Sequence, residues 1–404
     1  MLLARLMKVM VQSGRLTLVD AAGRVHHFGP EGGRPRVTMR VHDRALHRRL
    51  ALRPKLAFGE AFMDGTLTVE EGTLYDLLDL LATNIARYEA MPLARAFARF
   101  GMWTRHRQQR NHVDRARRNA AHHYDLSGRL YDLFLDKDRQ YSCAYFTNNN
   151  KTLDEAQHDK KRHLASKLLL QPGIKVLDIG SGWGGLALYL ARVGQADVTG
   201  VTLSSEQFKV SNERAKAEGL SERVRFHLRD YREEPGRYDR IVSVGMFEHV
   251  GAGNYRQFFR RLKELLSDDG VVLLHSIGRM SPPGTTNPWL RKYIFPGGYT
   301  PALSETVAAI EQEGLWITDI EILRLHYADT LKEWRRRFHA NRAEIARLYD
   351  ERFCRMWEFY LAGCEAAFRR LDQMVFQIQL AKRQDAVPLT RDYMLDWERA
   401  QMAA

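Results

Sequence analysis

The sequence predicts an α/β protein in which a doubly wound, mostly parallel sheet follows a small α+β domain. From about residue 172, short apolar runs alternate with amphipathic segments, which is the pattern of parallel strands joined by helices. The first of these runs leads into a glycine-rich turn at 180–185. The length of 404 residues exceeds one ordinary core, so about two domains are expected.

The small domain is expected over residues 1–105, where helical and strand-like patterns are both short. Asp43 is in a position to cap a helix that follows a strand. The expected elements are helices over 1–12 and 73–88, a hairpin of strands 15–19 and 25–28, and a further strand over 37–41. Residues 106–120 are rich in arginine and poor in large apolar residues, so they are interpreted as a linker.

The second domain is expected over residues 121–404, and its strands and helices alternate. The expected strands are 175–179, 197–201, 224–228, 238–244 and 270–275. The expected helices are 184–191, 205–218, 254–266 and a segment between about 300 and 315. Ligands of such sheets bind at the carboxyl ends of the strands, so the site is expected there.

Composition and charge limit the class of protein and its partners. Apolar residues make up 45% and charged residues 27%, and no run approaches the roughly 20 apolar residues that cross a bilayer. Arg5 and Lys8 interrupt the first apolar segment, which therefore does not resemble a signal peptide. The three cysteines, Cys143, Cys354 and Cys364, have no CxxC spacing, so neither disulfides nor a zinc site are predicted and a reducing cytoplasm is expected.

The net charge of +13 favours a polyanionic partner. The first 115 residues hold 19 Lys and Arg against 11 Asp and Glu, a local balance of +8. Nucleic acid and an anionic membrane surface both fit this charge, and a basic surface gains about 1 kcal/mol per Lys or Arg near anionic lipid. A role in solubility alone is the alternative interpretation of the charge.

The glycine turn predicts a nucleotide-like cofactor, because glycines let the backbone approach a ligand at the start of a helix. A nicotinamide enzyme would place an acidic residue about 20 residues later. Here the second strand ends in Thr202, Leu203 and Ser204, without an acid. The spacing of Asp178, Gly180, Gly182 and Gly184 also differs from G-x-G-x-x-G. Both facts count against a dehydrogenase and favour S-adenosylmethionine.

Polar groups follow three successive strands of the predicted sheet. The hydroxyls of Thr202 or Ser204 and the amide of Gln207 suit the polar rim of the cofactor. Asp230 and Tyr231, after the third strand, suit the amino group and the face of an adenine. The sequence therefore predicts an S-adenosylmethionine-dependent methyltransferase with a Rossmann-like class I fold.

Several motifs along the second domain resemble the cyclopropane-fatty-acyl-phospholipid synthase family, whose relatives include the mycolic acid cyclopropane synthases. They are His123–Leu126, Tyr141–Phe146, Val201–Ser204, Met246–Gly251, Leu274–Gly278 and Phe295–Gly298. The resemblance runs from about residue 119 to beyond Gly363, and Gly59–Gly65 resembles the amino-terminal domain of the branch that acts on bacterial phospholipids. Gly128 departs from the Asn or Asp of many relatives.

The resemblance implies a reaction in which the methyl group of S-adenosylmethionine is added across a cis double bond of a phospholipid acyl chain. Loss of a proton, with bound bicarbonate as the base, then closes a cyclopropane ring. The implied anion-site residues are Cys143, Glu248, His275, Ile277 and Tyr327. The implied cofactor residues are Tyr141, Ser142, Asp178, Gly180, Gly182, Thr202, Leu203, Ser204, Gln207, Asp230 and Tyr231.

The resemblance also implies partners and a location. It implies a homodimer that docks, through its first domain, on an unsaturated phospholipid in an anionic membrane, at the inner face of the cell membrane. It implies no nucleic acid partner. The mixed aromatic and basic stretches Trp289–Phe295 and Arg335–Arg337 are then candidates to contact lipid, although without the family they are equally well solvated faces.

Other interpretations stay open from the residues alone. The same carbocation can give a methyl- or methylene-branched chain instead of a ring. A nucleic-acid methyltransferase would carry an Asn/Asp-Pro-Pro-aromatic run after the fourth strand, where this chain has Met246–His249. A lipid-binding protein without catalysis is a weaker alternative.

Each polar candidate also has an ordinary structural interpretation. Glu248 can be a surface carboxylate, His275 a core histidine and Tyr327 a half-buried tyrosine. Cys143 can be a nucleophilic thiolate, but no oxyanion loop accompanies it. The H-E-x-x-H spacing is missing, so no metal is predicted.

Overall fold

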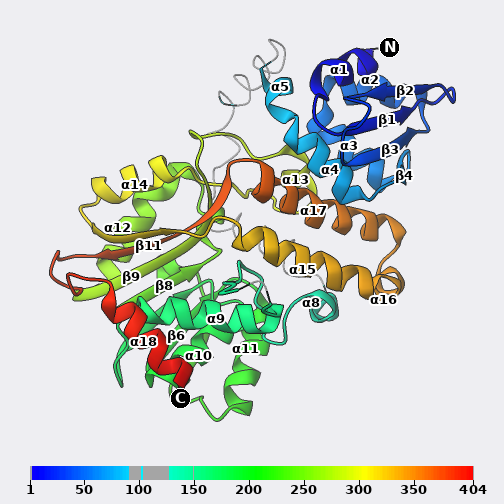
Figure 1. Ribbon diagram of the computed structural model, residues 1–404. Coiled ribbons are helices and arrows are strands. Elements are labelled where there is room, and N and C mark those ends of the chain that lie inside the picture. Colours follow the sequence, from blue (N-terminus) through cyan, green and yellow to red (C-terminus); the bar gives the residue numbers. More distant parts are fainter. Residues whose placement is uncertain (1, 91–101, 103–126, 149, 404) are drawn as a thin grey trace. The chain divides into compact units, whose positions relative to one another are not determined.

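The computed structural model describes residues 2–90, 102, 127–148 and 150–403 (Figure 1). Contacts divide these residues into two compact units. The first unit holds the described residues of Met1–Arg105, Thr285–Pro296 and Leu331–Gln373, and the second those of His106–Gly284, Gly297–Thr330 and Met374–Ala404. The predicted linker 106–120 and the motif His123–Leu126 lie outside the described residues, so the proposed domain boundaries stay a prediction.

The second unit is built on a seven-stranded sheet with the order β10-β11-β9-β8-β5-β6-β7. Its strands are β5 (Lys175–Ile179), β6 (Asp197–Thr202), β7 (Val224–Leu228), β8 (Tyr238–Val244), β9 (Leu266–Arg279), β10 (Trp316–Ile322) and β11 (Gln373–Ala381). Strands β7, β6, β5, β8 and β9 are parallel, and β10 pairs with β11 in antiparallel register. The predicted doubly wound α/β fold is confirmed.

Helices cover both faces of this sheet (Figure 1). They are α9 (Leu153–Ser166), α10 (Gly185–Gly194), α11 (Ser205–Ala217), α12 (Tyr255–Leu265), α14 (Leu303–Gln312) and α18 (Asp392–Ala403), and a further helix of this unit is α8 (Gly128–Phe134). Neighbouring residues of β5 point into different cores: Val176 packs with residues of α9 and α10, whereas Leu177 packs with residues of α12. Burial on both faces explains why the strands are continuously apolar.

The first unit contains a four-stranded sheet with the order β2-β1-β3-β4. Its strands are β1 (Arg15–Val19), β2 (Val25–Phe28), β3 (Arg36–Val41) and β4 (Leu67–Glu71). Its helices are α1 (Leu2–Met10), α2 (Arg44–Leu52), α3 (Pro54–Met63), α4 (Leu74–Thr83), α5 (Ile85–Glu89), α13 (Pro288–Tyr293), α16 (Arg342–Leu348) and α17 (Glu351–Arg370), with most of α15 (His326–Ala340). None of the described helices is long and apolar enough to span a bilayer.

The structure of the first unit differs from two of the predictions made from the sequence. The single helix predicted over 73–88 is two helices, because Asn84 ends α4 and its side chain accepts hydrogen bonds from the backbone of Gln12 and Ser13 at 2.9 and 3.0 Å. The prediction that Trp289 contacts lipid is wrong for that side chain. Trp289 is only 1% exposed, and a Cβ added to Gly59 of α3 would lie 2.4 Å from its ring.

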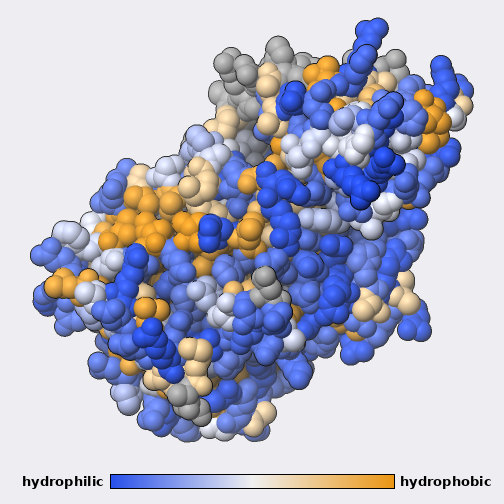
Figure 2. Space-filling model, in the orientation of Figure 1, coloured by the Kyte–Doolittle hydropathy of each residue, from blue (hydrophilic) through white to orange (hydrophobic). Residues whose placement is uncertain are grey.

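Apolar side chains gather on the surface of the second unit over the edge strand β10, beside α14 (Figure 2). Ile317, Ile320 and Ile322 are half-buried there, and Trp316 is 50% exposed. We call this surface the β10 apolar area.

Candidate active site

A pocket opens in the second unit where β5, β6 and β8 end. All eleven residues predicted to contact the cofactor line it: Tyr141, Ser142, Asp178, Gly180, Gly182, Thr202, Leu203, Ser204, Gln207, Asp230 and Tyr231. The lining also includes Trp183, Arg232, Met246 and His249. The predicted residues therefore share one cavity at the carboxyl edge of the sheet.

Gly180 and Gly182 of the glycine turn line this pocket, and the turn leaves no room for larger residues at Gly180 and Gly184. Gly180 has φ +80°, and an added Cβ would lie 2.9 Å from the Cβ of Met246. Gly184 has φ +84°, and its Cβ would lie 2.7 Å from the Phe226 ring. Both backbone conformations are ones that glycine adopts without a steric penalty.

The ends of β6 and β7 present polar groups that already have protein partners. Thr202 Oγ1 donates to Gln207 Oε1 at 2.8 Å, and Ser204 caps α11 by accepting from the Gln207 amide at 3.3 Å. The Asp230 carboxylate accepts from the Arg232 guanidinium at 2.6 and 2.8 Å. A ligand that hydrogen-bonds to Asp230 would share this carboxylate with Arg232.

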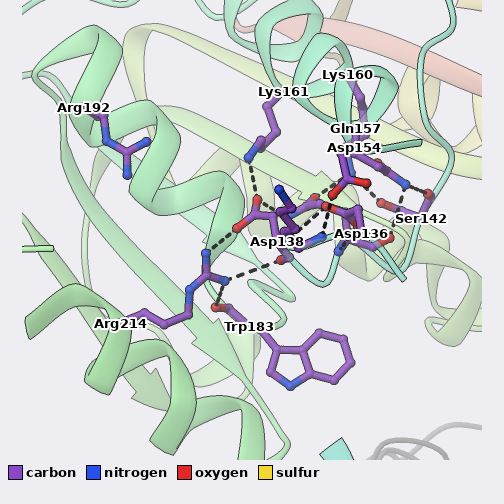
Figure 3. Close-up of polar contacts among 12 residues, drawn as sticks. Asp136, Asp138, Ser142, Asp154, Gln157, Lys160, Lys161, Trp183, Arg192 and Arg214 are labelled. Carbon is purple, nitrogen blue, oxygen red and sulfur yellow. Dashed lines mark hydrogen bonds and ion pairs between the residues drawn. The ribbon is translucent and has the colours of Figure 1, made fainter. Parts of the chain in front are cut away.

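Polar contacts hold a loop, residues 136–142, tightly in place (Figure 3), and its residues 139–142 line another side of the pocket. Asp138 pairs with Lys161 of α9 and with Arg214 of α11. The buried Lys160 ammonium donates to the Gln140 side chain at 2.5 Å and to Ser142 Oγ at 2.9 Å. Burial lowers the pKa of Lys160 to about 8. These bonds fix the backbone beside Tyr141 and Ser142 before a ligand binds.

Asp178 brings a carboxyl group into the pocket at the end of β5. It is 2% exposed, and its Oδ2 atom has no hydrogen-bond partner among the described residues. Burial raises its pKa to about 7, an effect that the charge of Lys160 reduces. A buried acceptor without a partner costs free energy, so this oxygen is suited to receive a donor from a ligand.

The residues predicted to hold an anion lie outside the lining of this pocket, but next to it in the chain. Cys143 directly follows Ser142, and Glu248 lies between the lining residues Met246 and His249. Glu248 Oε1 accepts from the Ile277 amide at 2.6 Å, and the Gly245 amide donates to the His275 carbonyl at 2.9 Å. The end of β8 thus joins Glu248, His275 and Ile277 in one buried group.

Glu248 is buried with half of its carboxyl unused. It is 9% exposed, and Oε2 has no partner in the part of the chain that the structure describes. Burial raises the pKa of Glu248 to about 7, and burial together with the charge of Lys160 lowers the pKa of His275 to about 3. Around neutral pH the group therefore offers a neutral imidazole and a carboxyl that readily exchanges a proton.

A hydrogen bond joins the segment that carries Cys143 to helix α15, which carries Tyr327. The Ala144 amide donates to Thr330 Oγ1 at 3.0 Å, and Thr330 lies about one helical turn after Tyr327 on α15. Cys143 is fully buried, its Sγ donates to the Ala144 carbonyl at 3.3 Å, and burial raises the pKa of its thiol. A thiol in this setting stays protonated, which disfavours the nucleophile interpretation.

Comparison with known proteins identifies the chain. The family model of mycolic acid cyclopropane synthetase matches residues 111–378. The chain belongs to this family. A probable fatty acid methyltransferase of Pseudomonas putida is 37% identical over 94% of this chain and 95% of its own length. A cyclopropane-fatty-acyl-phospholipid synthase of Escherichia coli K12 is 43% identical over 64% of this chain and 66% of its own.

A solved structure supports the same assignment. Mycolic acid cyclopropane synthase CmaA1, complexed with SAH and CTAB, has a TM-score of 0.62 and 33% identity, covering 65% of this chain and 97% of that one. This family member is therefore an S-adenosylmethionine-dependent methyltransferase with the predicted Rossmann-like class I fold. The predicted family and cofactor class are confirmed.

Sequence patterns missed several residues of this family member's site. Lys160 supports the wall of the pocket, yet a lysine within a helix normally indicates a solvated face. Its position four residues after Ala156, which is also buried, is a helical repeat that signals an inward-facing side. Trp183 lies among the glycines of the turn, and Arg232 lies two residues after Asp230. Both therefore follow strand ends, where ligands of such sheets bind, and they could have been predicted on that ground.

Proposed function

We propose that this enzyme adds the methyl group of S-adenosylmethionine to a cis double bond of an unsaturated phospholipid acyl chain and closes a cyclopropane ring. The observation that carries the proposal is Glu248, buried behind the pocket wall with an unpartnered oxygen. An alkene has no proton to lose before it attacks, so the proton must leave afterwards, in a site without water. A proton-exchanging group enclosed beside the cofactor pocket suits that order of events.

Aromatic and apolar residues of the pocket suit a cationic acyl chain. Tyr141 lines the pocket and is held edge-on by Tyr131 and Phe134, with ring centroids at 5.6 and 6.0 Å. An aromatic face stabilises positive charge without forming a bond to it. Phe247 stacks on Tyr255 within the core, with ring centroids 4.4 Å apart.

The anion-site residues fit a small oxyanion such as bicarbonate. When bound, bicarbonate would supply a base that is small enough to be enclosed and too firmly held to attack carbon. Glu248, when protonated, offers a donor at its unpartnered Oε2, while His275 carries a ring N–H donor and Tyr327 a hydroxyl donor. The Ile277 amide already donates a hydrogen bond to Glu248 Oε1 at 2.6 Å, so a bound anion would have to share this donor with Glu248.

The proposal is tested with the purified enzyme, labelled S-adenosylmethionine and vesicles of unsaturated phospholipid. The expected product is an acyl chain heavier by one CH₂ group, with cyclopropyl protons in its NMR spectrum. Buffer freed of carbon dioxide should slow turnover, and added bicarbonate should restore it. An unchanged acyl chain in the presence of bound cofactor would refute the proposal.

A second candidate function is methyl or methylene branching of the same acyl chain. It is favoured by the similarity to the probable fatty acid methyltransferase, which extends over 94% of this chain. A methylene branch has the same mass as a ring, so mass spectrometry alone does not separate them. NMR does, because vinylidene protons replace the cyclopropyl signals.

We also propose that the enzyme docks as a homodimer on the inner face of the cell membrane. The charge of +13 supports attraction to anionic lipid. Light scattering of the purified protein measures the oligomeric state, and a monomeric mass at working concentration would contradict the dimer.

A further inference from the structure

A line of buried polar side chains leads from His275 into the interior of the second unit. Gln377 of β11 is 1% exposed, and its Nε2 lies 3.1 Å from His275 Nδ1. Gln377 Oε1 lies 2.7 Å from the ammonium of Lys167, which follows α9 and is 2% exposed. The amide therefore bridges a buried cation and the imidazole.

Lys167 determines the orientation of the Gln377 side-chain amide. An ammonium group only donates, so the amide atom that faces it must be the oxygen. The NH₂ end then faces His275, and since this group also only donates, Nδ1 must be the ring nitrogen without a proton. A neutral imidazole carries one proton, which leaves it on Nε2.

Lys167 itself contacts a carboxylate that stays ionised. Its ammonium pairs with Glu321, whose Oε2 also lies 2.6 Å from His163 Nε2. Although burial works against it, the hydrogen bond from His163 and the charge of Lys167 lower the pKa of Glu321 to about 2. The other nitrogen of His163 lies 2.6 Å from Glu398 on α18. The orientation of Gln377 thus rests on an ammonium group that is anchored by a carboxylate that stays ionised.

We propose that Gln377 is a positioning residue that fixes the tautomer of His275 with its proton on Nε2, and that Lys167 acts through Gln377. His275 then presents a donor on the ring edge opposite Gln377. Among the described residues, Gln377 is the one side-chain hydrogen-bond partner of His275. Under the proposed function, the group that accepts a hydrogen bond from Nε2 is the small anion, and this part of the inference rests on that function. The tautomer of His275 does not depend on the proposed function.

The tautomer is measured directly by NMR of protein labelled with ¹⁵N at histidine. The chain has 15 histidines, so His275→Asn is used to assign the signal. Wild-type His275 is expected to carry its proton on Nε2. In Gln377→Glu a carboxylate accepts from both neighbours, so the proton should move to Nδ1. A wild-type proton on Nδ1, or an unchanged spectrum in Gln377→Glu, would overturn the proposal.

Gln379 offers a matched control on the same strand. It is also 1% exposed, and its Nε2 donates to the Lys167 carbonyl at 2.6 Å and to the Tyr393 hydroxyl at 2.8 Å. Gln379→Glu therefore buries the same carboxylate without touching His275, and the His275 tautomer should stay as in wild type. A shift in both variants would mean that any buried charge on β11 has this effect, which would also overturn the proposal.

Turnover gives a second, separate measurement. Gln377→Glu is expected to lower kcat by about 10- to 100-fold, as loss of an outer hydrogen-bond partner does at other sites, with cofactor Kd unchanged. If no variant and no wild-type protein forms product, the proposed function fails while the NMR result still decides the tautomer. If Gln377→Glu does not fold, Lys167→Met replaces it. That variant frees the amide to rotate and should give a mixture of tautomers, so a single unchanged tautomer would contradict the proposal.

Discussion

At the scale of single residues, Glu248 couples stability to pH. Burial raises its pKa from 4.5 to about 7, so the folded state holds this proton more tightly than the unfolded chain does. Its stabilising contribution is full below the unfolded pKa and is lost as the pH rises to about 7, a change of roughly 3 kcal/mol. Glu248→Gln lacks this titration. Relative to wild type, the variant should therefore be more stable at about pH 8 than at about pH 5.

Thermal unfolding at the two pH values measures this difference. The surface substitution Glu264→Gln, at a side chain that is 54% exposed, serves as the control and should not change the pH dependence. A Glu248→Gln variant whose stability relative to wild type is equal at both pH values would show that the carboxyl does not titrate in this range. The same variant should bind cofactor normally but lose about 100-fold or more in turnover, because an amide in the anion site cannot pass on the proton that the bound base receives.

Because the pKa of Asp178 is raised, we expect cofactor binding to depend on pH. Its carboxyl, with a pKa of about 7, lines the pocket and ionises as the pH rises from 6 to 8. S-adenosylhomocysteine carries an ammonium group, so its affinity should increase over this range, by up to about tenfold per pH unit below the pKa. Asp178→Asn should bind more weakly and lose that dependence. Calorimetric titration measures both effects.

Asp197 provides the control for this experiment, because it lies at the opposite end of β6 and its side chain is 40% exposed. Asp197→Asn should keep both the affinity and its pH dependence. Retention of the wild-type dependence in Asp178→Asn would assign it to another group of the pocket.

At the scale of elements, the turn between β5 and α10 depends on glycine for two separate reasons. In that turn Gly184 has φ +84° and lies against the Phe226 ring, whereas Gly173, which precedes β5 and serves for comparison, has φ +75° with open space around it. Gly173→Ala should cost about 1–2 kcal/mol from backbone strain alone. Gly184→Ala should cost about 1–3 kcal/mol more, because the added methyl group overpacks the ring. Urea unfolding of both variants compares them, and equal losses would contradict the packing argument.

Elements were predictable from the sequence where local pattern and tertiary role agree. Strands β5, β7 and β8 lie where apolar runs predict them, and all eleven predicted cofactor residues line one pocket. Nine of them lie at or just after the ends of β5, β6 and β7, whereas Tyr141 and Ser142 were implied by the family resemblance. The break between α4 and α5 was not predictable, because Asn84 bonds to a segment 71–72 residues away. The edge strand β10 and its partner β11 were missed as well, and with them Gln377, whose partner Lys167 is 210 residues distant.

At the scale of the whole molecule, topology explains how one site draws on so many segments. Parallel order places the ends of β5, β6 and β8 at one edge, and the adjacent β9 and β11 place His275 beside Gln377. Because these strands come from distant parts of the sequence, the site exists only when the sheet is complete. Local motifs therefore identify the cofactor class, whereas the partners of the anion-site residues require the folded chain.

We expect membrane docking to depend on the basic charge of the chain. On α2, Arg44 and Arg48 are exposed one turn apart. If basic residues of the first unit attract anionic lipid, Arg44→Gln/Arg48→Gln should weaken vesicle binding by about 2 kcal/mol at low salt, roughly 30-fold. The difference should shrink as added salt screens the charges. Vesicle sedimentation at several salt concentrations measures it.

The matched control removes two exposed charges from the second unit, Lys209→Gln/Lys216→Gln on α11. If this pair weakens binding as much as the arginine pair does, attraction depends on net charge and not on the first unit. Binding that is indifferent to salt but falls in Trp316→Ala would instead assign docking to the β10 apolar area, where this ring is 50% exposed. Because charge attraction is screened and apolar insertion is not, the salt series separates the two modes in one experiment.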